Sequence, residues 1–139
     1  MAHLIDWRRF ILERPRTAKL ATVRADGRPH VAPVWIDLDG DQVIFTTGAS
    51  SVKGTALRRD PRVALCLDDE TPPFAFVIIE GIAELSDDLD EIRRWGARIG
   101  GRYMGIEHAD EYGERNAAPG ELLVRVTSTK IVALGGITD

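Results

Sequence analysis

The sequence predicts a mainly β fold with short helices, in which six antiparallel strands form a small barrel. The length of 139 residues, with 44% hydrophobic and 29% charged residues, is typical of a single globular domain spanning residues 1–139. Short runs rich in Val, Ile, Thr and Phe alternate with Asp-Gly turns, which is typical of antiparallel hairpins. A barrel is favoured because closing a sheet removes its exposed edges.

The first half of the chain is expected to form one helix and three strands. Apolar residues recur at helical spacing over residues 4–14, and Pro15 stops this amphipathic helix because it denies its neighbours helical geometry. An Asp-Gly turn at residues 25–28 joins the first two strands, since Asp and Gly tolerate positive φ. The three strands are predicted at residues 17–23, 29–36 and 42–46.

The second half is expected to form two helices and three further strands. A helix over residues 51–59 is ended by an Asp-Pro pair, and the next helix begins at Ser86 as its N-cap, before acidic residues that suit a helix N-terminus. Gly100-Gly101 is expected to end or bend that helix, and residues 102–120 to form a loop with one short helix at most. The strands are predicted at residues 62–67 and 74–85, and residues 122–134 are expected to form one long strand or two short ones.

Residues 74–79 form the longest apolar run of the chain, with six residues. In a barrel wall alternate side chains face the interior and the outside, so a continuous apolar run means that the outer face is covered too. The expected helices are short for this task. We therefore expect a homodimer, in which a second subunit covers the strand.

The composition excludes several classes of function. The 18 Lys and Arg residues against 22 Asp and Glu give a net charge of −4 without any basic block, so no nucleic-acid partner is expected. No apolar run approaches the roughly 18 residues of a membrane span. The N-terminus also lacks a signal-peptide pattern, so we expect a cytoplasmic protein with no membrane partner.

The sequence lacks the usual motifs of metal and nucleotide sites. His3, His30 and His108 lie far apart and no Cys-x-x-Cys pair exists, so no metal site is expected. The Gly-rich turns that bind dinucleotides and triphosphates are missing. The single Cys66 lies in an apolar strand, where a free thiol usually behaves as a small core residue.

Residues 46–53 combine the end of a strand, a glycine turn and the start of a helix. Hydroxyls, an ammonium group and free backbone N–H groups converge there, which favours an anion such as phosphate. Alternatively, a serine only caps the helix and Lys53 is solvated. The polar residues of this segment are Thr46, Thr47, Ser50, Ser51 and Lys53.

Several short motifs follow one another along the chain. They are Leu20-Ala21-Thr22, Asp26-Gly27-x-Pro29-His30, Pro33-Val34-Trp35, Thr46-Thr47, Ser51-x-Lys53 and Leu57-Arg58-Arg59-Asp60-Pro61-Arg62-Val63. In this order and spacing, nearly the whole chain resembles the pyridoxamine 5′-phosphate oxidase-like split β-barrel superfamily. The small size and residues 120–126 are most similar to the coenzyme F420-dependent oxidoreductases of that superfamily.

The resemblance implies a six-stranded split barrel that forms a homodimer, with a flavin-type cofactor in a groove at each end of the interface. Trp35 is expected either to wall the cofactor ring or the substrate or to pack in the core. The cofactor-binding residues that the resemblance implies are Ala32, Pro33, Val34 and Trp35 along the ring, Thr46 and Thr47 beside it, and Ser50, Ser51 and Lys53 at the phosphate.

The resemblance further implies hydride transfer from reduced coenzyme F420 to an unsaturated small molecule of the enone, quinone or tetrapyrrole type. The proton donor is left open among Tyr103, His108, Tyr112 and solvent. Two alternatives remain: an FMN-binding oxidase or flavin reductase of the same fold, and a non-catalytic barrel that binds a deazaflavin, flavin or haem-like ligand. F420 is favoured over FMN because flavin-binding oxidases often have Arg where this chain has Val52, and because the C-terminal Arg and Trp of vitamin B6 oxidases have no counterpart after Lys130.

Overall fold

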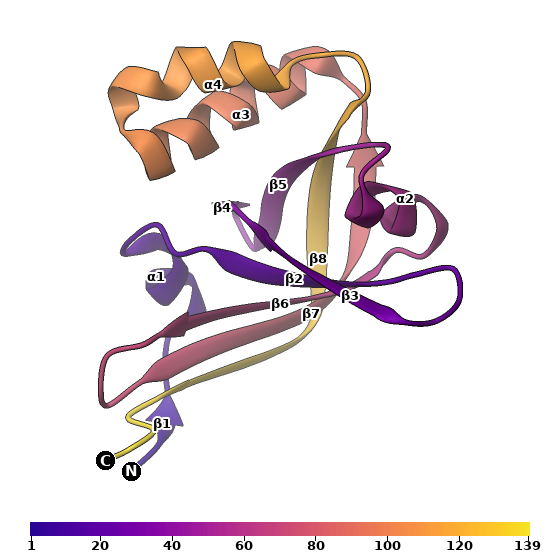
Figure 1. Ribbon diagram of the computed structural model, residues 1–139. Coiled ribbons are helices and arrows are strands. Elements are labelled where there is room, and N and C mark those ends of the chain that lie inside the picture. The colour runs from indigo at the N-terminus through magenta and orange to yellow at the C-terminus, as the bar shows by residue number, and fades with distance from the viewer.

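The computed structural model describes residues 1–139 and confirms a mainly β, antiparallel fold with short helices (Figure 1). The chain forms eight strands, four α-helices and one short 3-10 helix. In chain order they are β1 (His3–Leu4), α1 (Trp7–Leu12), β2 (Ala18–Val23), β3 (Pro29–Val34), β4 (Asp37–Asp39), β5 (Gln42–Gly48), α2 (Val52–Arg59), β6 (Arg62–Asp69), β7 (Ala75–Ser86), α3 (Leu89–Met104), η1 (Ile106–His108), α4 (Ala109–Asn116) and β8 (Glu121–Gly135). The chain ends lie side by side, because β1 pairs with the end of β8 (Figure 1).

The sheet runs in the order β3-β2-β6-β7-β8-β5-β4, and β1 pairs with β8 outside this path. β3 and β4 lie at the two ends of the order and do not pair with each other, so the sheet is not closed, contrary to the expectation of closure. Only Trp35 and Ile36 separate these strands, which makes them two parts of one bent stretch. At this bend the backbone itself therefore joins the two edges of the sheet.

The short strands β1 and β4 bring the number of strands to eight instead of the expected six. They contain two and three residues, which is too short for an alternating pattern to reveal. The helix expected over residues 4–14 is shorter in the structure, where α1 begins at Trp7 because Leu4 belongs to β1. Asp6 caps α1 by accepting hydrogen bonds from the N–H groups of Arg8 and Arg9.

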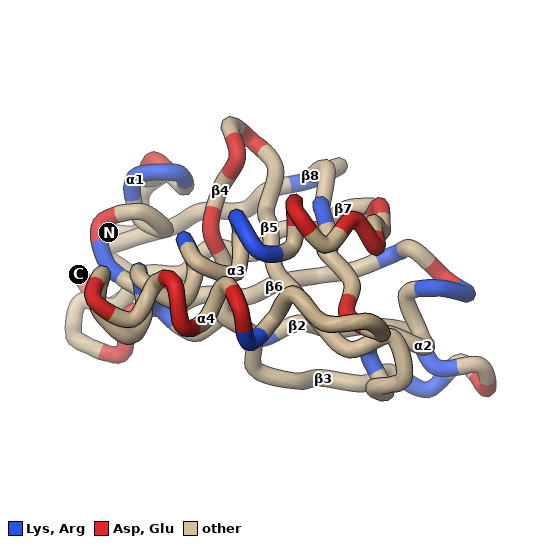
Figure 2. The backbone as a smooth tube through the Cα atoms, turned by 90° about the horizontal axis from the view of Figure 1, so that it is seen from above, with Lys and Arg blue, Asp and Glu red and all other residues tan.

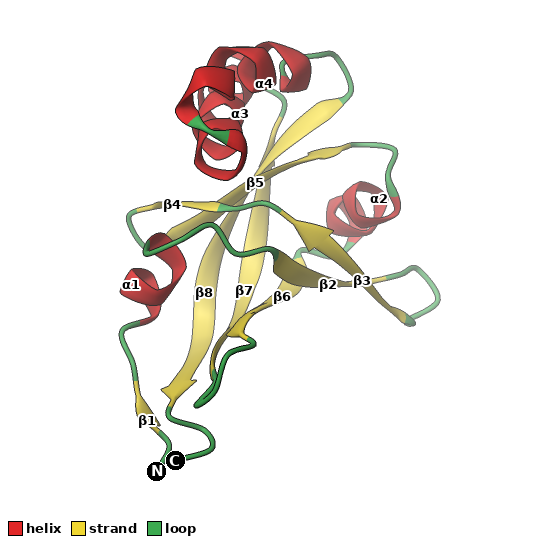
Figure 3. Ribbon diagram, turned by 60° about the vertical axis from the view of Figure 1, so that its left-hand side comes forward, coloured by secondary structure: helices red, strands yellow, loops and turns green.

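The main core lies inside the curved sheet, where 19 buried residues form one cluster. α1 contributes Phe10 and Ile11 and α2 contributes Leu57, so both helices pack against the inner side of the sheet (Figure 3). A second cluster lies between α3 and the opposite face of β5 and β8, so β5 is buried on both faces. Its members are Ile44, Ile92, Trp95, Ile99 and Leu123.

α3 and α4 lie side by side over one end of the sheet and form what is called here the α3–α4 hairpin (Figures 1 and 3). Ser86, the expected N-cap, is the last residue of β7, and Asp88 caps α3 instead. α3 also continues through Gly100-Gly101 rather than ending or bending there. The expected loop at residues 102–120 consequently holds the end of α3, the turn η1 and all of α4.

The α3 glycines permit close packing of the two helices instead of ending α3. A Cβ atom on Gly100 would lie 2.2 Å from the Cβ atom of Tyr112, and one on Gly96 would lie 3.1 Å from the Cβ atom of Asn116. Only a residue without a side chain allows α4 to approach this closely at Gly100. None of the helices combines the length and the apolar composition that crossing a bilayer requires.

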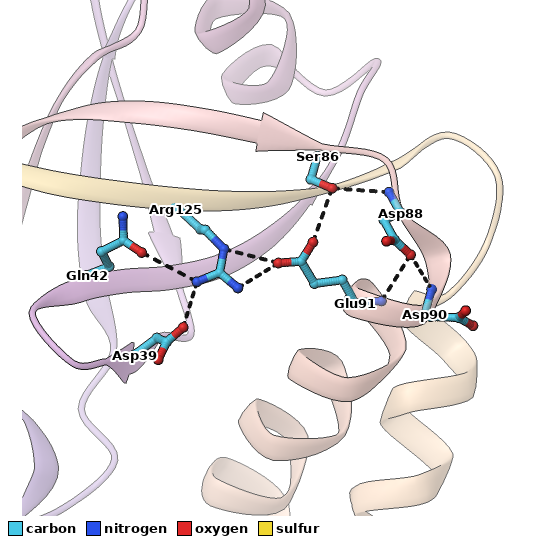
Figure 4. A network of polar contacts seen from close by, with 7 residues as sticks. All are labelled: Asp39, Gln42, Ser86, Asp88, Asp90, Glu91 and Arg125. Atoms are coloured by element: carbon cyan, nitrogen blue, oxygen red, sulfur yellow. Dashed lines mark hydrogen bonds and ion pairs between the residues drawn. The ribbon is translucent and has the colours of Figure 1, made fainter.

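A polar network around Arg125 of β8 ties the α3–α4 hairpin to the sheet (Figure 4). Its guanidinium donates to Oε1 of Glu91 on α3, at 2.6 Å from Nη2 and 3.1 Å from Nε. Nη1 donates to Oδ2 of Asp39 at the end of β4, 2.7 Å away. Charge-assisted hydrogen bonds are strong, and Arg125 forms them with both Glu91 and Asp39. The network therefore holds α3 against β5 and β8.

Candidate functional site

A cavity of about 380 Å³ lies between the sheet and the α3–α4 hairpin. β3, β5 and the start of α2 form one side of this cavity, and α3 and α4 form the other. No aspartate or glutamate lines it. The lining residues are Thr17, Pro33, Val34, Trp35, Thr46, Lys53, Ile99, Gly100, Tyr112, Arg115 and Asn116.

Trp35 forms an aromatic wall at the bend between β3 and β4. Its ring stacks on Tyr103, with centroids 5.0 Å apart and planes 7° from parallel, and it lies 5.8 Å from the ring of Tyr112. The Tyr103 hydroxyl donates to the carbonyl of Arg16 and accepts from the N–H of Ile36. Trp35 is therefore held by aromatic packing at the cavity, where it is 37% exposed, and it belongs to neither core cluster.

Lys53 and Arg115 are the two cations of the cavity, and neither has an ion pair or a side-chain hydrogen bond within the chain. Lys53 lies in the first turn of α2, and Arg115 lies in the last turn of α4. The nearby Arg98 is different, because Asp37 neutralises it at 3.6 Å. With two uncompensated cations and no carboxylate, the cavity attracts anions.

The hydroxyl of Ser51 serves the start of α2 rather than the cavity. It accepts from the N–H of Gly54 at 3.0 Å and donates to the carbonyl of Gly48 at 2.8 Å. A hydroxyl has one proton, so Thr47 donates in the 3.1 Å contact with Ser51. A Cβ on Gly54 would lie 2.1 Å from the Gly48 carbonyl oxygen, which explains why a glycine stands at this contact.

The structure brings five of the nine predicted cofactor residues together on the cavity. These five are Pro33, Val34, Trp35, Thr46 and Lys53. The other four, Ala32, Thr47, Ser50 and Ser51, do not line it. Thr47 is buried beneath the start of α2 and Ser50 is exposed beside it.

On the side of the site that the α3–α4 hairpin forms, sequence reasoning named only Tyr112 as a candidate among the residues that line the cavity. Arg115 and Asn116 belong to no motif and lie in a segment expected to be mostly loop, so no local pattern marks them. Ile99 shows helical spacing, which indicates a buried face but not a cavity. Thr17 is expected to be the first residue of a strand, and no neighbouring residue marks it as part of a site.

The three side chains considered as proton donors differ in their position relative to the cavity and in their hydrogen bonds. Tyr112 lines the cavity, and its hydroxyl has no hydrogen-bond partner within the chain. The Tyr103 hydroxyl is occupied by the contacts to Arg16 and Ile36. His108 lies outside the cavity and pairs with Glu111 on α4, with 3.1 Å between Nδ1 and Oε2.

The chain matches the family model of pyridoxamine 5′-phosphate oxidase over residues 6–134. It is also 34% identical over 95 residues to the pyridoxine/pyridoxamine 5′-phosphate oxidase of Cupriavidus metallidurans. That match covers 68% of this chain and 44% of the relative, so the chain spans less than half the length of this curated relative.

Solved structures resemble the fold over most of its length. The conserved hypothetical protein Rv2991 of Mycobacterium tuberculosis has a TM-score of 0.76 and 29% identity, covering 88% of this chain and 79% of the other. An F420 reductase has a TM-score of 0.71 and 26% identity, covering 93% of this chain and 98% of the other. An oxidase and a reductase are thus among the relatives. Because the family model matches all but the two ends of the sequence, the chain belongs to the pyridoxamine 5′-phosphate oxidase family.

Proposed function

We propose that the protein is a coenzyme F420-dependent oxidoreductase that transfers a hydride from the reduced deazaflavin to an unsaturated small molecule of the enone, quinone or tetrapyrrole type. The observation that carries this proposal is a cavity with an aromatic wall at Trp35, two unpaired cations and no carboxylate. Such a cavity suits a flat aromatic ligand with anionic groups. The likeness to an F420 reductase over 93% of the chain supports the choice of cofactor.

The residues of the cavity fit a deazaflavin bearing a phosphate. A volume of about 380 Å³ suits part of a small-molecule ligand. Lys53 would neutralise the phosphate as a point charge, helped by the free N–H groups in the first turn of α2. Trp35 would contact the ring and Thr46 would offer it a hydroxyl. When bound, the reduced cofactor supplies a hydride to the acceptor.

Tyr112 is the side chain that we assign as proton donor. Reduction of a carbon–carbon double bond requires a proton at the carbon next to the one that receives the hydride. The Tyr112 O–H bond would break, its proton would form a C–H bond on the acceptor, and solvent would reprotonate the phenolate. Its hydroxyl is free for this role because no group of the chain holds it.

We also propose that two copies of the chain associate through the outer face of β6 and β7. A hollow of about 430 Å³ on this face is lined largely by apolar side chains, among them Phe74, Phe76, Ile78 and Ile137. Burial raises the pKa of the Cys66 thiol in the same hollow, which keeps it protonated and apolar in character. A second copy would remove this apolar surface from water.

An FMN-dependent oxidase is the second candidate function. It is favoured by the family itself and by the 34% identity to a pyridoxine/pyridoxamine 5′-phosphate oxidase. A third possibility is a barrel that binds the same cofactors without turnover. The candidates differ in what the protein does with each cofactor, so turnover assays distinguish them.

The test is oxidation of reduced F420 by the protein in the presence of an acceptor, either cyclohexenone or menadione. We expect the absorbance of the oxidised deazaflavin to return faster with protein than without it. A parallel assay measures hydrogen peroxide formed from pyridoxamine 5′-phosphate and oxygen with FMN. Peroxide without any F420 oxidation would favour the oxidase. The absence of both activities would contradict both enzyme assignments.

A further inference from the structure

The α3–α4 hairpin contributes polar groups to the cavity that the proposed cofactor contacts do not use. The residues proposed for the cofactor come from β3, β5 and α2, on one side of the cavity. Tyr112, Arg115 and Asn116 come from α4, on the other side. If the first side holds the cofactor, the second side faces the acceptor.

We propose that Arg115 binds a carboxylate of the acceptor, so that the substrate class is an unsaturated compound carrying a carboxylic acid. This inference rests on the proposed function, because it takes the cofactor to occupy the Lys53 side. The guanidinium is a planar fork of donors that matches a carboxylate in two parallel hydrogen bonds.

Arg115 has no ion pair, because the neighbouring acidic residues of α4 contact other partners. Glu111 lies one turn before Arg115, where it could form an ion pair along the helix, but it pairs with His108 at 3.1 Å. The adjacent Glu114 pairs instead with Arg93 of α3, with 3.0 Å between Nε and Oε1. Both carboxylates of the last turns of α4 therefore contact partners other than Arg115. Figure 2 marks the acidic and basic positions along the backbone of α4.

Arg115 differs in this respect from the other arginines of the hairpin beside the cavity. Arg98 is neutralised by Asp37, and Arg102 donates to the carbonyl of Ile11. Arg94 is also without an ion pair, but it lies near Trp95 and outside the cavity. Arg115 is thus the one uncompensated guanidinium that lines the cavity.

Arg115 is an exposed residue that lines the cavity beside the ring of Tyr112. Its guanidinium carbon lies 5.5 Å from the centre of the Tyr112 ring, a cation–π distance that restricts the side chain. α4 itself is held tightly, because a Cβ on Gly113 would lie 2.9 Å from the carbonyl oxygen of Arg93. The neighbouring Asn116 lines the same cavity and offers an amide donor.

The test compares an acid with its ester in the wild type and in Arg115→Met, which keeps most of the side-chain volume without the charge. The probes are 3-benzoylacrylate, an enone carrying a carboxylate, and its ethyl ester, with reduced F420 as the donor. Arg94→Met is the matched control, because Arg94 lies on the same hairpin outside the cavity. We expect Arg115→Met to lower kcat/KM at least tenfold for the acid and less than threefold for the ester, with the Kd for F420 unchanged.

An equal loss for acid and ester would overturn the proposal, since it would indicate a general effect on the site. A weaker Kd for F420 with an unchanged ratio of acid to ester would also overturn it, by assigning Arg115 to a carboxylate of the cofactor. Calorimetric binding of the saturated analogue 3-benzoylpropionate to both proteins tests the contact without turnover. If the wild type binds this acid more tightly than Arg115→Met does but binds no F420, the proposed function fails while Arg115 stays assigned to a carboxylate. If Arg115→Met binds the acid as tightly as the wild type, the assignment fails.

Discussion

At the scale of single residues, the cavity is set apart by charges and hydroxyls that have no partner within the chain. Lys53 is the predicted phosphate ligand that lines it. We predict that Lys53→Ala weakens cofactor binding by about 1.5 to 3 kcal/mol, because a charge-assisted contact is lost. The free energy of unfolding should not change, since Lys53 makes no ion pair in the protein. Fluorescence titration and urea unfolding measure the two quantities, with Lys130→Ala, at an exposed position within β8, as control. An unaltered cofactor affinity would remove Lys53 from the site.

Tyr112 and Tyr103 allow a matched comparison at the same scale. Tyr112→Phe keeps the ring beside Trp35 but removes the free hydroxyl, so we predict a fall in kcat of about 10²- to 10⁴-fold with an unchanged Kd for the cofactor. Tyr103→Phe should instead lower the free energy of unfolding by about 1 kcal/mol, because it loses structural hydrogen bonds. If kcat and its pH profile stay the same in Tyr112→Phe, solvent supplies the proton.

At the scale of elements, the α3–α4 hairpin depends on the absence of side chains at its contact. We predict that Gly100→Ala lowers the free energy of unfolding by about 1 to 3 kcal/mol, because its methyl group would overlap Tyr112 and push α4 away. Gly101→Ala is the control, since a Cβ there would lie 3.2 Å from Ala109 and the helix gains propensity from Ala. Urea unfolding of the two variants measures the difference. Equal stability in both would contradict the role assigned to Gly100.

The same hairpin shows what local sequence patterns can and cannot predict. The predicted long strands agree closely with β6, β7 and β8, because runs rich in Val, Ile and Phe between turn residues are a local signal. The expectation that Gly100 ends or bends the helix is wrong, because the sequence does not distinguish a glycine that stops a helix from one that lets a neighbouring helix pack closely. Arg115 could not be assigned, because its lack of a partner depends on contacts that His108 and Arg93 make in three dimensions.

At the scale of the whole molecule, the proposed association of two copies predicts different effects for substitutions at two neighbouring isoleucines of β7. Ile79 points into the core and is 1% exposed, whereas Ile78 faces outward into the apolar hollow. We predict that Ile79→Asp unfolds the chain, because it buries an unpaired charge, and that Ile78→Asp yields a folded monomer. Ile106→Asp is the control, since Ile106 is 83% exposed and lies in η1. Light scattering and circular dichroism report the size and the fold, and a stable dimer of Ile78→Asp would refute the interface.

The proposed function requires that the cavity between the sheet and the α3–α4 hairpin hold a deazaflavin. A fluorescence titration of the protein with coenzyme F420 and with FMN, side by side at fixed salt, tests this claim most directly because salt screens phosphate contacts. We predict micromolar or tighter binding of F420 and much weaker binding of FMN. Tighter binding of FMN, or binding of neither cofactor, would contradict the claim.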